Sequence, residues 1–307
     1  MRSMRMVRRV LMAMVVVATA TLVPVASGSA AFVVPPPEGP WGYTYGDQLG
    51  GRQFQDCRFY RVAMGNGVAE ELGSEITCAD GLTFSPSGVL YGYTIPGAVG
   101  PGQESDLVTI DPATGAQTVV GSLGDVFFEG GMTFDAAGNL WLYGEAGDQP
   151  CGLNIQCLFK IDPATAAVTP VGGIADFYVS GLAADCDTLY ATGSFSDGLA
   201  NNTLYTIDTA TGAPTEVGDT GLLMFTEGLD FGSDGTLYTI GEPFNNGPPS
   251  YAPKLATVDP TTGAGTEVAQ WLSNDSVPNV IFGLAVGGVS CAPPAPEPVD
   301  VEPNFTG

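Results

Sequence analysis

The chain repeats one phrase five times, and this repetition constrains its fold more than any other feature. The clearest copy, LVTIDPATGAQTVVGS, begins at Leu107, and further copies begin at Leu158, Leu204 and Leu255. A weaker copy, FYRVAMGNGVAEELGS, begins at Phe59. A period of about 50 residues is typical of an array of similar supersecondary units. The content of one unit therefore decides the fold.

Each unit contains two hairpin signals. In LVTIDPATGAQTVV, two β-rich runs flank the turn sequence DPATG, where Pro sets φ, Asp can bond its own backbone and Gly accepts a positive φ. A second phrase at 81–94, GLTFSPSGVLYGYT, flanks SPSG in the same way. The units show no apolar pattern at helical spacing. The sequence therefore predicts four short antiparallel strands in each unit.

The strands are apolar on both faces, as in the run Leu140, Trp141 and Leu142. A sheet with two apolar faces must be covered on both, and stacking similar sheets around an axis achieves this. Complete units occupy roughly 81–122, 131–173, 181–219 and 228–270. The remaining pieces form one more: 41–46 matches a second strand, 57–74 a third and fourth, and 283–288 a first. We therefore predict an all-β, five-bladed β-propeller over 41–291, closed by strands from both ends.

Repeats alone do not establish that the ring closes, so an open β-solenoid or a β-sandwich is the alternative. The repeated patterns L-Y-x-I-D-x-x-T-G-x-x-T-x-V-G and G-L-x-F-x-x-x-G-x-L-Y resemble those of secreted bacterial repeat propellers, the lactonase-like, NHL-like and quinoprotein-like proteins. The resemblance covers almost the whole of 41–291 and implies the propeller fold. It implies little about function, because the shared residues are turn and core residues.

The two ends of the chain differ in composition from the repeats. Residues 1–30 combine an Arg-rich start, an apolar run and the small-residue stretch ASGSAA, which predicts a secretory signal peptide; an uncleaved anchor is the alternative. Residues 31–40 are a stiff Pro-rich lead-in, and the Pro- and acid-rich residues 292–307 are predicted to be a disordered tail. No segment after the signal is apolar enough to cross a membrane. We expect a secreted, extracellular bacterial protein.

The chain is strongly acidic, with 33 Asp and Glu against 9 Lys and Arg and a formal net charge of −24. This charge excludes nucleic acid and anionic lipid as partners. An acidic coat that keeps the protein soluble is the plain interpretation. Calcium or a cationic polymer as partner is the alternative.

Six cysteines fit an oxidising compartment. We define the top face by the loops that join strands 2 to 3 and strand 4 to the next blade, and the bottom face by the 1–2 and 3–4 turns. Propeller geometry on these faces pairs 57–78, 151–157 and 186–291, among Cys57, Cys78, Cys151, Cys157, Cys186 and Cys291. The alternative joins Cys57 to Cys291 across the closing blade.

The chain has no histidine, which excludes His-based nucleophilic sites and His-ligated zinc. Carboxylates are predicted to gather where the top face meets the axis: Asp80, Glu129, Glu227, Asp230, Glu145 and Glu242. Three interpretations are open. The acids are solvated loop residues; or Asp80, Glu129, Glu227 and Asp230 bind Ca²⁺ through oxygen ligands; or Glu227, Asp230 and Glu129 form a glycosidase-like acid–base set.

Five aromatic residues lie in the 4–1 loops without being required by the repeat, and they are the predicted ligand contacts: Phe127, Phe128, Phe177, Tyr178 and Phe225. By contrast, Tyr91, Trp141, Tyr190 and Tyr238 recur at one register and are predicted to be core residues. The recurring Asp111, Asp162, Asp208 and Asp259 are predicted to be turn residues.

These features favour a monomeric, non-enzymatic propeller, without a cofactor other than Ca²⁺, that binds an extracellular ligand through its top-face loops. The ligand would be a carbohydrate or a component of the cell envelope. A carboxylate-based glycoside hydrolase or lyase is the rival hypothesis, and a purely structural envelope or matrix protein is the third.

Overall fold

The architecture is known from a computed structural model, in which every regular element is a β-strand. It describes residues 38–47, 57–75, 77–95, 104–146, 156–174, 176–186, 188–195, 203–243, 252–273, 277–278 and 280–287, without the side chains of Ser74, Glu75, Phe128 and Glu129. The described residues all belong to one compact unit, 34–307. The described part of the chain has no helix suited to spanning a bilayer.

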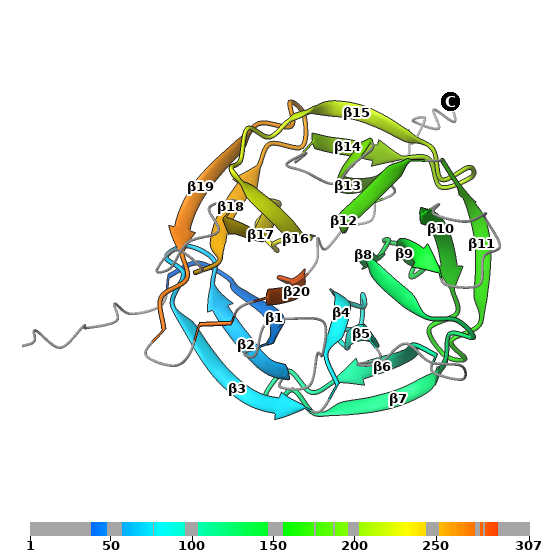
Figure 1. The fold of residues 1–307 in the computed structure, drawn as a ribbon, viewed down its shortest axis with the longest axis horizontal. Helices are drawn as coiled ribbons and strands as arrows, with labels where there is room; N and C mark the ends of the chain where they lie inside the picture. Colours follow the sequence, from blue (N-terminus) through cyan, green and yellow to red (C-terminus); the bar gives the residue numbers. More distant parts are fainter. Residues whose placement is uncertain are drawn as a thin grey trace, which may run out of the picture. The chain divides into compact units, whose positions relative to one another are not determined.

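The strands form five four-stranded antiparallel sheets arranged as a ring (Figure 1). Each sheet is a blade whose strands follow one another from the axis outward. Blade 1 is β4 (Ala79–Phe84), β5 (Leu90–Thr94), β6 (Asp106–Ile110) and β7 (Gln117–Ser122). Blade 2 is β8 (Phe127–Phe134), β9 (Leu140–Ala146), β10 (Gln156–Ile161) and β11 (Val168–Gly173). Blade 3 is β12 (Phe177–Asp185), β13 (Thr188–Phe195), β14 (Thr203–Ile207) and β15 (Pro214–Asp219). Blade 4 is β16 (Met224–Phe231), β17 (Leu237–Pro243), β18 (Lys254–Val258) and β19 (Gly265–Gln270).

The fifth sheet, which we call the closing blade, combines both ends of the ring. Its strands from the axis outward are β20 (Val280–Ala285), β1 (Trp41–Asp47), β2 (Cys57–Ala63) and β3 (Ala69–Glu75). β1 pairs with β20 from Tyr43 opposite Ala285 to Asp47 opposite Val280. The predicted five blades and their closure by strands from both ends are therefore confirmed, and the solenoid and sandwich alternatives are wrong.

Glycine lines the axis where the five inner strands approach one another. The glycine that opens each second phrase lies there: Gly81, Gly131, Gly181, Gly228 and Gly283. A Cβ on Gly131 would lie 2.2 Å from the amide nitrogen of Leu182 on the next blade, and one on Gly228 would lie 2.5 Å from that of Leu284. The cavity left at this level is about 10 Å³, which holds about one water molecule at most. The axis is therefore closed at its middle.

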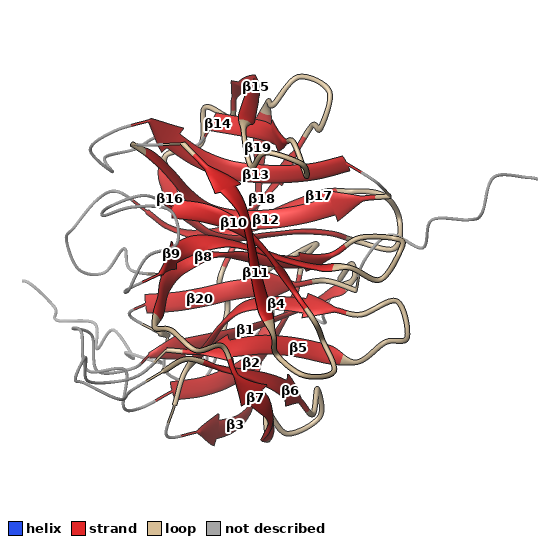
Figure 2. Ribbon diagram, turned by 90° about the vertical axis from the view of Figure 1, so that its right-hand side faces the viewer, coloured by secondary structure: helices blue, strands red, loops and turns tan. Residues whose placement is uncertain are grey.

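The outer turns connect neighbouring blades. A Cβ on Gly172 in β11 would lie 2.4 Å from the carbonyl oxygen of Thr211, in the 3–4 turn of blade 3. The same approach brings Gly218 of β15 to Thr262 in blade 4, at 2.2 Å. This contact explains the glycine of the repeated V-G, because only a residue without a side chain lets the next turn approach so closely. Figure 2 shows these turns and the strands from the side.

Aromatic side chains fill the space between blades. Tyr91 of blade 1 meets Phe134 of blade 2 edge to face, with ring centroids 5.3 Å apart, and Tyr190 of blade 3 meets Phe231 of blade 4 at 5.6 Å. Trp141 and Tyr238 occupy the same register and are only 6% and 7% exposed, respectively. The aromatics that recur with the repeat are core residues, as predicted.

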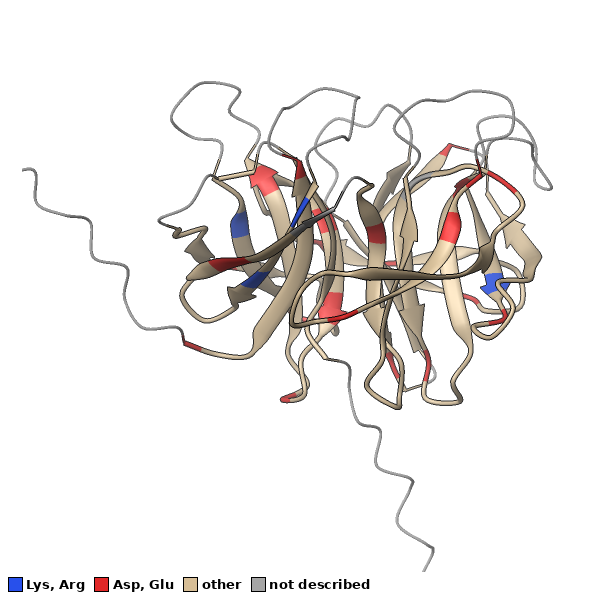
Figure 3. Ribbon diagram, turned by 90° about the horizontal axis from the view of Figure 1, so that it is seen from below, with Lys and Arg blue, Asp and Glu red and all other residues tan. Residues whose placement is uncertain are grey.

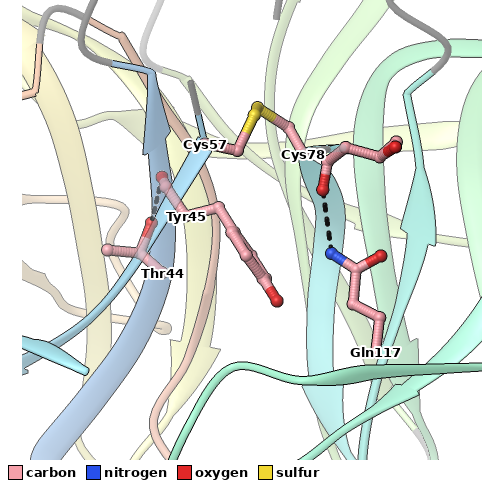
Figure 4. The surroundings of a disulfide bond; sticks show 6 residues. Thr44, Tyr45, Cys57, Cys78 and Gln117 are labelled. Carbon is pink, nitrogen blue, oxygen red and sulfur yellow. Dashed lines mark hydrogen bonds between the residues drawn. A yellow bond between two sulfur atoms is a disulfide. The ribbon is translucent and has the colours of Figure 1, made fainter. Parts of the chain in front are cut away.

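A disulfide joins the closing blade to blade 1. Cys57 opens β2, and Cys78 directly precedes β4 (Figure 4); their Cα atoms are 5.1 Å apart. The predicted 57–78 pair is therefore confirmed, which excludes the alternative pair of Cys57 with Cys291. Cys157 and Cys186 are also disulfide-bonded. Their predicted partners, Cys151 and Cys291, lie outside the described residues, so those two pairings remain predictions.

Candidate functional site

Polar side chains of one blade cap the start of the inner strand of the next. The Ser105 hydroxyl accepts the Phe127 N–H at 2.9 Å, and Gln156 Oε1 accepts the Val179 N–H at 2.6 Å. In the same way Glu242, near the end of β17, accepts the Ile281 N–H of β20 through Oε1 at 3.1 Å. Glu242 caps from a second strand, whereas Ser105 directly precedes and Gln156 opens a third strand, so here a carboxylate accepts where two other blades use neutral acceptors nearby.

Glu242 has a strongly perturbed carboxyl group. Burial raises its pKa from 4.5 to about 7, and the hydrogen bond from Ile281 offsets this only in part. A carboxyl group with such a pKa is partly protonated at neutral pH and can donate a proton. Glu145, at the matching position of blade 2, is also half-buried.

Both carboxylate oxygens of Asp80 accept hydrogen bonds from residues of the same blade. Its side chain is 6% exposed. Oδ1 accepts the Gly81 N–H at 2.7 Å, and Oδ2 accepts the Tyr93 hydroxyl at 3.2 Å. Both oxygens therefore have protein donors, as expected for a buried carboxylate that supports structure.

Asp230 connects blade 4 to the closing blade. Its side chain is 4% exposed. Oδ1 accepts the Phe231 N–H at 2.9 Å, and Oδ2 accepts the N–H of Val286, directly after β20, at 2.7 Å. In blades 1 and 2 the same register holds Thr83 and Thr133. Blade 3 and the closing blade hold Ala183 and Ala285 there, so the acid at Asp230 was a signal in the sequence that this position has a special role.

The predicted carboxylates do not share one cavity. Glu227 lines the small axial cavity, whereas Asp230 lines a larger one at the bottom face, and Asp80 lines neither. The Glu129 side chain lies outside the described residues. Among the described side chains, no group of three or more Asp, Glu or Cys could hold a metal ion. The four-residue Ca²⁺ site, which needs Glu129, remains a prediction.

The predicted aromatic contacts divide into two groups. Phe127 and Phe177 are each 1% exposed and pack in the inter-blade cores, with Phe127 against Phe159 at 5.2 Å and Phe177 against Tyr205 at 4.9 Å. In this structure neither ring is accessible to a ligand. Tyr178 and Phe225 are half-buried, so part of each side chain remains accessible. Phe128 lies outside the described side chains.

The recurring turn aspartates accept hydrogen bonds within their own turns, as predicted. Asp111 accepts the Ala113 N–H through Oδ1 at 2.9 Å, and this bond lowers the pKa of Asp111. The pKa of Asp162 is lowered by the equivalent bond from Ala164. Figure 3 shows acidic residues at several of the described turns, whereas the basic ones are few. The basic residues of the described part all lie on third strands: Arg58, Arg61, Lys160 and Lys254.

A large cavity lies at the bottom face and was not predicted. It has a volume of about 670 Å³ and is lined by inner-strand ends and 1–2 turns around the axis. Its wall carries four half-buried aromatic side chains: Trp41, Tyr43, Phe84 and Phe134. Sequence reasoning could recognise these residues as apolar strand residues. It could not show that they leave part of their surface open toward the axis.

No family model matches the chain, and no curated protein matches it. Solved propeller structures do resemble it. An exo-β-1,3-galactanase from Phanerochaete chrysosporium superposes with a TM-score of 0.54 at 14% identity, over 76% of this chain and 61% of the galactanase. An exo-β-1,3-galactanase from Clostridium thermocellum gives 0.51 at 14% identity, over 75% and 63% of the two chains. A putative exo-β-1,3-galactanase from Bifidobacterium bifidum gives 0.51 at 13% identity, over 78% and 90%.

These likenesses support the propeller fold and nothing finer, because identity is only 13 to 14%. The chain also spans only 61 to 63% of the length of the first two galactanases. Any shared chemistry has to be argued from this chain's own residues.

Proposed function

We propose that the protein is a non-enzymatic β-propeller that binds an extracellular ligand, or a component of the cell envelope or matrix, through its top face. The observation that carries the proposal is the state of Asp80 and Asp230. Both carboxylates are buried, and each oxygen accepts a hydrogen bond from the chain itself. Carboxylates held in this way stabilise the ring and are poorly placed to exchange protons with a substrate.

The described part of the top face offers Tyr178 and Phe225 as candidate contacts, because both are partly accessible near the start of inner strands. Half-buried aromatic rings present apolar surface with little freedom to lose on binding. Disulfide bonds and a propeller fold are compatible with an extracellular location.

Glu242 supports a second candidate, a carboxylate-based glycoside hydrolase or lyase. Its pKa of about 7 is suited to a general acid at neutral pH. The three galactanases named above have the same kind of fold, which makes polymeric β-1,3-galactan a reasonable first substrate to try. A partner carboxylate would have to come from Glu227 or Glu129.

One experiment separates the two candidates. The purified protein is incubated with β-1,3-galactan and with a panel of plant and bacterial polysaccharides, and both released reducing ends and retention on the immobilised polysaccharides are measured. The proposal predicts retention without release. Release that disappears in Glu242→Gln and Glu227→Gln, while both variants keep the parent's melting temperature, would establish the enzyme instead. A protein that is neither retained nor active on the panel and on cell-wall fractions would contradict both.

A further inference from the structure

The cavity at the bottom face is a blind pocket. Inner-strand residues of blades 1 to 4 border it, and Val286, directly after β20, completes the ring. Toward the middle of the axis it meets the ring of glycines, where only about 10 Å³ remains. A blind pocket of about 670 Å³ is within the usual size range of small-molecule sites.

Two hydroxyl groups without a hydrogen-bond partner among the described residues line this pocket. Thr83 and Thr133 occupy equivalent positions on β4 and β8, line the pocket, and are only 3% and 2% exposed, respectively. Among the described residues, neither hydroxyl has a hydrogen-bond partner, and neither is sealed off from solvent. Buried hydroxyls need a partner. These two hydroxyls therefore bond to water in the empty pocket and are available to a ligand that displaces it.

Aromatic rings form one side of the pocket. Tyr43 and Trp41 come from β1, Phe84 from the end of β4 and Phe134 from the end of β8. The rings are held in place by their neighbours: Tyr43 meets Phe84 edge to face at 5.6 Å, and Arg61 lies over Trp41 at 4.5 Å. A fixed apolar wall beside polar groups is what a ligand with one apolar face requires.

The charges of the lining point to a neutral ligand. Its carboxylates are Asp135 and Asp230, and the described lining has no Lys or Arg to pair with an anion. Asp230 already accepts two backbone N–H groups. Asp135 accepts the backbone and side-chain amides of Asn139 and the indole N–H of Trp141. Fixed donors thus offset both negative charges and leave little attraction for a cation.

We propose that this pocket binds the ring of a neutral sugar. The ring's apolar C–H face would lie on the aromatic wall, and its hydroxyls would bond to the Thr83 and Thr133 hydroxyls. The site lies on the face opposite the top-face loops. It therefore goes beyond the proposed function and does not depend on it.

Ligand-observed NMR and titration calorimetry of the full chain test the proposal. The probes are the methyl glycosides of galactose, glucose and mannose, with glucuronic acid as the anionic probe and glucosamine as the cationic one. We expect at least one neutral glycoside to bind, with both methods detecting the binding. We expect each charged probe to bind about tenfold more weakly. Thr83→Val and Thr133→Val, which keep the side chain's shape, should each weaken binding about fivefold.

Two controls keep the test decisive. Thr133→Ser retains the hydroxyl and should keep the dissociation constant within about twofold. Thr206→Val, on β14 and away from the pocket, should leave binding unchanged. The proposal is overturned if no neutral glycoside binds at about 50 mM, if a charged probe binds more tightly, or if the Thr83 and Thr133 variants bind as the parent does.

Discussion

The closing blade shares one kind of joint with the four repeat blades and has further contacts of its own. Between repeat blades the recurring contact is backbone to backbone: a DPxTG-type turn sits on a glycine of the preceding blade, as Thr211 does on Gly172. The closing blade keeps this contact toward blade 1, where a Cβ on Gly73 would lie 1.9 Å from the Thr114 carbonyl oxygen, and adds side-chain hydrogen bonds toward blade 4. Asp230 and Glu242 of blade 4 hold the backbone of β20 and of Val286 just beyond it.

Further contacts hold the closing blade, and only some of them are absent from the repeats. The Thr44 hydroxyl of β1 lies 2.9 Å from the carbonyl oxygen of Gly283, as the Thr239 hydroxyl of β17 lies 2.7 Å from that of Gly228, whereas the disulfide between Cys57 and Cys78 joins the closing blade to blade 1. The ion pairs Arg58–Glu71 and Arg61–Glu70 lie between β2 and β3 of this blade, and Lys254–Glu267 repeats the first of them in blade 4. The comparison teaches that the contacts of the duplicated units also serve the joint between the two ends of the chain. Asp230, Glu242 and the 57–78 disulfide are added to them there.

The largest effect is expected from Asp230→Ala. The change leaves the buried N–H groups of Phe231 and Val286 without their acceptor, and each such loss costs about 1–3 kcal/mol. The free energy of unfolding, measured by urea denaturation, should fall by about 4 kcal/mol. Asp234→Ala is the control, because Asp234 serves an exposed turn inside blade 4 and its loss should cost less than about 1 kcal/mol. Equal losses in both variants would show that Asp230 does not fasten the ring.

Removal of the 57–78 disulfide should have the next largest effect. The two cysteines are 21 residues apart, and in the chain-entropy account a loop of this length contributes about 3 kcal/mol. The Cys57→Ser, Cys78→Ser double variant should therefore unfold at lower urea concentration by that amount. Peptide mapping confirms that the other cysteines remain oxidised. A loss below about 0.5 kcal/mol would mean that the noncovalent contacts alone close the ring.

Glu242 should make the closing joint sensitive to pH. Its pKa is about 7 in the folded protein and about 4.5 when unfolded, so the folded state binds more protons between these values. Stability is therefore expected to decline by up to about 3 kcal/mol as pH rises from 4.5 to 7, and to level off outside this window. Glu242→Gln should remove the decline. Glu145→Gln, at the matching position of blade 2, is the control. A parent protein whose stability is flat over this range would contradict the raised pKa.

The smallest of the four effects is expected from Gly172→Ala, which changes the contact between two neighbouring repeat blades. Gly172→Ala places a methyl group 2.4 Å from the Thr211 carbonyl oxygen, and forcing the blades apart should cost about 2 kcal/mol. In blade 4 the same register already holds an alanine, Ala269, opposite the weaker repeat copy of the closing blade. Ala269→Gly should change stability by less than about 1 kcal/mol. If both changes have the same effect, the glycine contact is not what joins the repeat blades.

The sequence was sufficient to predict the blades, their number and the closure, because turn chemistry and apolar pattern recur in register. Phe127 and Phe177 were predicted to contact a ligand, but both rings are buried in the structure. The ladder between inner and second strands shifts register just after them, at Phe128/Gly130 and Val179/Gly181. Such a bulge disrupts the regular alternation of side chains, and the alternating pattern does not reveal it.

The roles of Asp230 and Glu242 and the blind pocket were also beyond sequence reasoning. Each depends on which strand ends meet at the axis after closure, and no local pattern contains that information. Asp230 was predicted to lie with Glu227 in one site, yet the two residues line different cavities on either side of Gly228.

The pairing of β1 with β20 also has a consequence for how the protein is made. Tyr43 finds its partner Ala285 only after the four repeat blades between them have been synthesised. Until then the first three strands present an open sheet edge to whatever is nearby, and such edges invite aggregation. Assembly of this ring is therefore expected to be slow, governed by its most distant contact, and in need of protection for its earliest strands while the last one emerges.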